Sequence, residues 1–169
     1  MNIVRKLTVG AAAGALGTVA MDVLWYRRYR RQGGTARFPE WEFAEAVSDW
    51  ESASAPGQVG RKAAEFVLGE TPPAAWARPA TNLVHWATGV GWGFGYAIAK
   101  AVFPHSRLVA GALGPGAWLT SYAILPLLKI YRPIWRYDAR TLRDDLSAHL
   151  VFGLTTAAVF AVLTRARRR

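Results

Sequence analysis

The sequence of 169 residues contains no cysteine, so disulfide bonds, thiol catalysis and thiolate metal sites are all excluded. It also lacks a nucleophile motif, a phosphate-binding loop, a nucleotide-binding fingerprint and a zinc-protease motif. We therefore expect a protein that is not an enzyme and that carries no cofactor.

Acidic residues are scarce, with 11 Asp and Glu against 21 Lys and Arg, for a net charge of +10. Such a balance is typical of nucleic-acid-binding proteins, but no basic helix with interleaved aromatic residues is present. The arginines lie beside apolar blocks instead, where anionic lipid head groups are the simpler partner. We expect the chain to bind a lipid bilayer and no nucleic acid.

The apolar residues, 52% of the chain, collect in four blocks at 7–26, 82–103, 108–130 and 146–163. A hydrocarbon core about 30 Å thick needs about 20 helical residues, and all four blocks are near that length. No block alternates with period two, which disfavours strands. The sequence predicts an all-α integral membrane bundle with four transmembrane helices, forming one membrane domain over 1–169. A cleaved signal peptide is the alternative for the first block.

The connection 27–80 is the only long one between blocks. It begins with a basic cluster that we expect to bind lipid head groups, namely Arg27, Arg28, Arg30 and Arg31. Two short amphipathic helices are predicted at 40–50 and 57–68. They would lie at the membrane interface or cover the bundle, and a partner-binding site is the alternative.

Small residues predict where helices approach closely. Gly10-xxx-Gly14 lies in the first block, and the second block carries glycines on two adjoining faces. We expect Gly10, Gly14, Gly91 and Gly95 to make helix-packing contacts. In the third block, Gly114-Pro115-Gly116 predicts a kink.

Charge also bears on orientation. With four spans, the side that holds both termini carries eight basic residues and no acid, in short segments beside the helices. The other side has more basic residues, among them the cluster 27–31, but spreads them over longer connections. We predict that both termini of this multi-pass protein are cytoplasmic. Three of the eight, Arg167, Arg168 and Arg169, lie outside the residues that the structure describes.

Three ionisable residues, Asp22, His85 and His149, fall inside predicted spans. Each lies three or four residues from a helix end, and those ends are on the same side, so all three should share one depth. Such groups usually face a bundle interior or a wet cavity. Three interpretations remain open: hydrogen bonds between helices, a proton-linked site, or a metal site of two histidines and a carboxylate. Because no helical turn carries paired ligands, we expect no metal.

The segment 85–104 resembles the YagU-like family of small bacterial inner-membrane proteins. The resemblance rests on His85, Gly95-Tyr96 and Val102-Phe103-Pro104, with Arg107 and Ala110-Gly111-Ala112-Leu113 following and His149-Leu150 opening the last block. It covers about the C-terminal half. It implies a multi-span inner-membrane protein without assigned enzymatic activity, and gives weight to His85 and His149.

The leading prediction is a small non-enzymatic membrane protein that responds to pH through Asp22, His85 and His149. One alternative is an assembly subunit of a membrane complex, which would use the glycine faces to bind a partner protein or a second copy. The other is a transporter of a small solute or ion, built on the break at Gly114-Pro115-Gly116.

Overall fold

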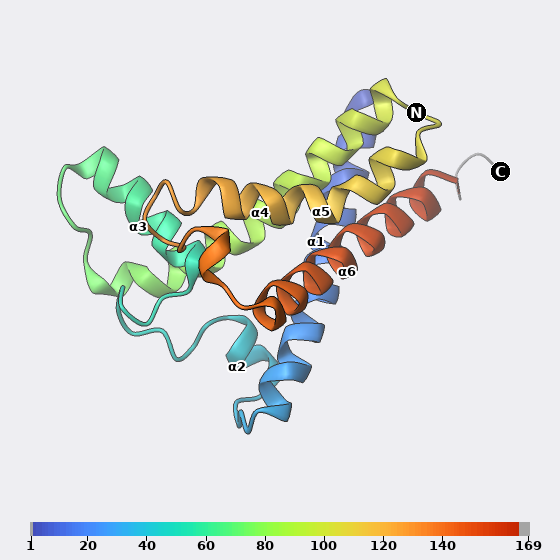
Figure 1. Ribbon diagram of the computed structural model, residues 1–169. Coiled ribbons are helices and arrows are strands. Elements are labelled where there is room, and N and C mark those ends of the chain that lie inside the picture. Colours follow the sequence, from blue (N-terminus) through green and yellow to red (C-terminus); the bar gives the residue numbers. More distant parts are fainter. Residues whose placement is uncertain (1, 166–169) are drawn as a thin grey trace.

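The computed structural model describes residues 2–165. Of these residues 76% are helical, and none forms a strand. The prediction of an all-α protein is confirmed. The α-helices, which Figure 1 labels, are α1 (Ile3–Arg31), α2 (Phe38–Glu42), α3 (Ala55–Leu68), α4 (Ala77–Val102), α5 (Arg107–Ile124) and α6 (Ala139–Arg165). Two short 3-10 helices, Ala74–Trp76 and Ile134–Arg136, precede α4 and α6.

Two of the described helices, α1 and α6, are long and apolar enough to cross a membrane. Both helices extend past both ends of the predicted blocks 7–26 and 146–163, because turns with polar residues continue the helix there. By contrast, α5 is shorter than the predicted block 108–130. It ends at Ile124, shortly before Pro126, which has no backbone N–H with which to continue the helical hydrogen bonds.

The connection differs most from its prediction. The expected helix 40–50 is reduced to the five residues of α2, and the chain turns at Ala44, whose φ is +49°. Trp50 is buried outside any helix, with its indole Nε1 donating to the carbonyl of Pro72 at 2.8 Å. The second predicted helix is confirmed as α3, which ends at Gly69 in a left-handed conformation with φ +75°.

Helix α1 packs against both α4 and α6, while α5 packs against α6 and α3 against α4. Figure 1 shows that α1 begins and α6 ends at the same end of the molecule, where the turn between α4 and α5 also lies. Helices α2 and α3 lie away from this end. We call it the terminal end, and the end that carries α2 the connection end.

The α1–α4 contact is made by glycines. A Cβ on Gly14 would lie 2.4 Å from the carbonyl oxygen of Gly89, and one on Gly93 would lie 2.1 Å from that of Gly10. The prediction for Gly10 and Gly14 is confirmed. We call these four residues the glycine interface; only glycine lets the two backbones come this close.

The prediction for Gly91 and Gly95 is wrong. Both are exposed, and a Cβ on either would meet nothing within 4 Å. Positions two residues apart on a helix point about 200° apart, so the face with Gly89 and Gly93 packs and the other stays free.

Helices α5 and α6 also cross on glycine. A Cβ on Gly153 would lie 2.4 Å from the backbone nitrogen of Gly114. Helix α5 continues without interruption through Pro115, which follows Gly114 directly. The region of the expected break is therefore a packing contact between helices.

Candidate functional site

At the connection end of the α1–α4 contact, Asp22 and His85 meet. Asp22 lies on α1 and is only 3% exposed, and His85 lies on α4. The Nε2 atom of His85 is 2.9 Å from Oδ2 of Asp22, a hydrogen bond between the two helices. The sequence placed these residues at one depth, and the structure brings them into contact.

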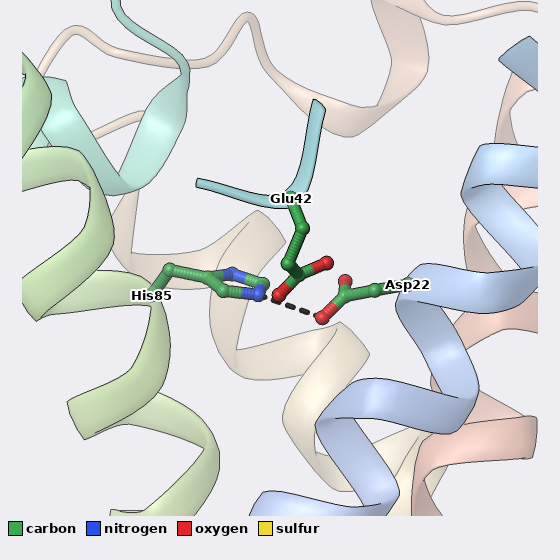
Figure 2. A group of neighbouring side chains, drawn as sticks. All are labelled: Asp22, Glu42 and His85. Carbon is green, nitrogen blue, oxygen red and sulfur yellow. Dashed lines mark hydrogen bonds and ion pairs between the residues drawn. The ribbon is translucent and has the colours of Figure 1, made fainter. Parts of the chain in front are cut away.

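A third ionisable side chain, Glu42, completes the group and was missed by the sequence analysis. Figure 2 shows that Glu42 reaches from the connection toward Asp22 and His85. One ligand atom from each residue lies within 4.8 Å of the others. Both carboxylate oxygens of Glu42 are buried, and neither has a hydrogen-bond partner among the described residues. We call Asp22, Glu42 and His85 the acid–histidine cluster.

The electrostatics of Glu42 follow from this position. Burial, the largest cause, and the nearby negative charge of Asp22 together raise the pKa of its carboxyl to about 7, against an opposing effect of His85. The two acids nearest Glu42 in the sequence have partners of their own: Glu40 pairs with Arg37, and Glu45 is 3.6 Å from Arg78. His85 is thus the one basic group that the described residues place in the cluster.

The cluster opens to a cavity of about 520 Å³, which α1, α4 and the connection enclose. Its lining includes Asp22, Glu42 and His85, together with Tyr29 and Trp41. The cavity therefore brings solvent or a small solute up to the cluster, although the carboxylate oxygens of Glu42 are themselves buried. Proton exchange with solvent requires such access.

Asp22, Glu42 and His85 are also the residue types that bind divalent cations. Ligands around a tetrahedral zinc ion are about 3.3 Å apart, given bonds of about 2.0 Å. The Asp22–His85 pair is closer than that, at 2.9 Å, and would have to separate to admit an ion. The geometry therefore fits a hydrogen-bonded pair that shares protons better than it fits a metal centre.

His149 does not join the cluster. Its Nδ1 atom is 3.0 Å from the carbonyl oxygen of Asp145 and 3.3 Å from the Asp145 carboxylate, one turn earlier in α6. The expected grouping of Asp22, His85 and His149 is corrected accordingly: there are two acid–histidine groups. Both border a second cavity of about 510 Å³ on the side of the bundle.

The basic cluster at the end of α1 divides into two kinds of residue. Arg28 donates to the carbonyl of Asp144 at 2.6 Å and to the hydroxyl of Ser147 at 2.7 Å, so it joins α1 to α6. The expectation that Arg28 binds lipid is corrected, because its guanidinium is used inside the protein. Arg27, Arg30 and Arg31 are exposed, and for them lipid binding stays a prediction.

Comparison of the chain with protein-family models, with curated proteins and with solved structures found no match. The site is therefore interpreted from its own geometry.

Proposed function

We propose that this chain is a four-span membrane protein without enzymatic activity, in which the first connection docks on the bundle in a proton-dependent way. Glu42 is the group that senses the proton, and Asp22 and His85 form the surface onto which it docks. The proposal keeps the predicted response to pH but replaces His149 by Glu42.

Four spans are supported by the surfaces of α4 and α5 as well as by the two apolar helices α1 and α6. Helix α4 has 26 residues, which give a length of about 39 Å. Large apolar side chains are exposed on α4 and α5, including Leu83, Ile98, Val102, Leu108 and Leu119. In water such a surface would be costly, and lipid accommodates it.

An interfacial position of the connection is supported by α3. Phe66 is 92% exposed there, and its neighbours Val67 and Leu68 are exposed too. Helices with such an apolar surface lie in the head-group region of a membrane. The resemblance to the YagU-like family favours a bacterial inner membrane with cytoplasmic termini, and both assignments are part of the proposal.

The observation that carries the function is the buried, unpartnered carboxylate of Glu42 beside a second carboxylate. Ionised Glu42 places two negative charges beside one histidine in a poorly solvated site, which disfavours docking. Protonated Glu42 removes one charge and supplies a donor. The connection is also held to the bundle by Trp50, which packs with Ala53 and Ala77, so this anchor stays in place when Glu42 is released.

The sign of the pH dependence follows from linkage. The pKa of Glu42 is about 7 when the segment is docked and returns toward its ordinary value of 4.5 when it is released. The docked state binds the proton more tightly, so docking is complete at low pH and weakens as the pH rises toward and through 7.

Spin labels test this directly, since the chain has no native cysteine. We would place cysteines at Val23 on α1 and Ala46 on the connection, both exposed, and measure their separation in lipid vesicles from pH 5 to 9. The expected result is one narrow distance at pH 5 and a broader, longer distribution at pH 9. Glu42→Gln, which cannot ionise, should keep the narrow distance throughout.

The matched control is Glu51→Gln, which makes the same change on an exposed acid of the same connection that forms no ion pair among the described residues. It should behave as the unmodified protein does. A distance that is independent of pH in the unmodified protein contradicts the proposal. A response that EDTA abolishes and zinc restores would replace the proton by a metal ion.

A further inference from the structure

A third cavity lies at the terminal end of the bundle, whereas the acid–histidine cluster lies at the connection end. It has a volume of about 670 Å³ and lies between α1, α4, α5 and α6. Its lining contains five Lys and Arg side chains and no acid: Arg5, Lys6, Lys100, Arg107 and Arg165. Four different helices supply these cations, so the positive charge is gathered by the tertiary fold.

None of the five cations forms an ion pair within the part of the chain that the structure describes. Lys100 donates from Nζ to the carbonyls of Pro104 at 2.7 Å and Ser106 at 3.2 Å, which holds the turn between α4 and α5. Its charge stays uncompensated by any carboxylate. Gathering like charges is unfavourable unless an anion binds among them.

One wall of this cavity is apolar. Tyr96 and Phe160 pack edge to face with ring centroids 5.3 Å apart, and Ala110 and Ala157 lie beside them. Outside the cavity, the end of α4 and the start of α5 expose large apolar side chains, with Val102 63% and Leu108 84% exposed. A ligand that suits both surfaces carries a phosphate next to hydrocarbon chains.

We propose that this cavity binds the phosphate-bearing head group of an anionic phospholipid, whose acyl chains lie along the exposed surface of α4 and α5. Basic cavities between transmembrane helices bind such head groups. With five cations, a lipid with two phosphates binds more tightly than one with a single phosphate. The inference rests on the membrane placement of the proposed function and is independent of its proton response.

The test is native mass spectrometry of the full chain in detergent with equimolar cardiolipin, phosphatidylglycerol and phosphatidylcholine. We expect retention in that order, with phosphatidylcholine the weakest. The double variant Lys6→Gln and Arg107→Gln should lose anionic-lipid affinity by tenfold or more, because each substitution removes a cation that makes no side-chain hydrogen bond or ion pair among the described residues.

The matched control is Arg136→Gln with Arg140→Gln, which removes the same charge from exposed positions outside the cavity. It should retain lipid as the unmodified chain does. Equal loss in the control, or no preference over phosphatidylcholine, overturns the proposal. Displacement of the lipid by equimolar inorganic phosphate identifies a free-phosphate site and overturns the lipid assignment.

Two further variants separate a loss of lipid binding from unfolding and from the proton response. If the double variant unfolds, Arg165→Gln at the end of α6 replaces it, with a smaller expected loss of about fivefold. Glu42→Gln should retain lipid fully. Lipid binding without a pH response contradicts only the proton proposal, and a pH response without lipid selectivity contradicts only this one.

Discussion

The two halves of the α1–α4 contact use opposite means to hold the same pair of helices. Toward the terminal end, Gly10, Gly14, Gly89 and Gly93 bring the backbones together without any side chain. Toward the connection end, Asp22 and His85 keep the helices apart by the length of two side chains and join them by one hydrogen bond. The first half excludes water and ligands, and the second leaves room for Glu42 and a cavity.

Because of this difference, we expect the two halves to respond to different changes: the glycine half to added volume, and the polar half to charge and pH. Glycine contacts depend on volume, so they respond to any added atom and to no change of pH. The acid–histidine cluster depends on charge, so it tolerates substitutions of equal size and responds to protons. A rigid contact beside a titratable one lets the connection move while the helices stay packed.

The largest effect is expected at the glycine interface. Gly93→Leu forces a side chain against the carbonyl of Gly10, where even a Cβ would lie at 2.1 Å. Because that atom is backbone, α1 and α4 must separate, at a cost of about 3 kcal/mol in the free energy of unfolding. Chemical denaturation in detergent measures it. The control Gly91→Leu adds the same atoms where nothing lies within 4 Å, and should change stability little. Equal destabilisation by both would contradict the packing of the glycine interface.

A smaller effect is expected in the polar half. Asp22→Asn keeps the size of the side chain and a hydrogen bond to His85 but removes the charge, for a loss of about 1 kcal/mol in stability. It also removes one of the causes that raise the pKa of Glu42, though not the larger one, burial. The connection should therefore release at a lower pH than in the unmodified protein and more weakly. The spin-label distance between positions 23 and 46 reports this, and an unchanged titration would exclude a role for Asp22 charge.

The glycine interface and the polar half also differ in how far the sequence predicted them. Length, apolar composition and the absence of period two predicted the helices, and the Gly-xxx-Gly spacing predicted a close contact at Gly10 and Gly14. The rotation of α4 about its axis was not predictable, because its glycines form two faces with equally small residues: Gly89 with Gly93, and Gly91 with Gly95. Only packing against α1 distinguishes them.

For the acid–histidine cluster, the distance of each residue from its helix end predicted that Asp22 and His85 lie at the same depth in the membrane. It could not predict that His149 pairs with Asp145, because the distance from a helix end gives the depth of a residue but not the direction in which its side chain points. Glu42 was missed for a different reason. It lies in a helix of five residues that tertiary contacts, such as those of Phe38 and Trp41 with Tyr26, position rather than local periodicity.

The smallest expected effect separates the two acid–histidine groups. His149→Gln breaks an i,i+4 interaction with Asp145 within α6, which stabilises a helix by about 0.3–0.5 kcal/mol. Because His149 makes no hydrogen bond or ion pair with Asp22, Glu42 or His85, the titration of the spin-label distance should keep its midpoint. His85→Gln is the paired comparison and should shift it. If His149→Gln shifts the midpoint as far as His85→Gln does, the two groups act as one through the 510 Å³ cavity that both border, and the separate action of Glu42 is refuted.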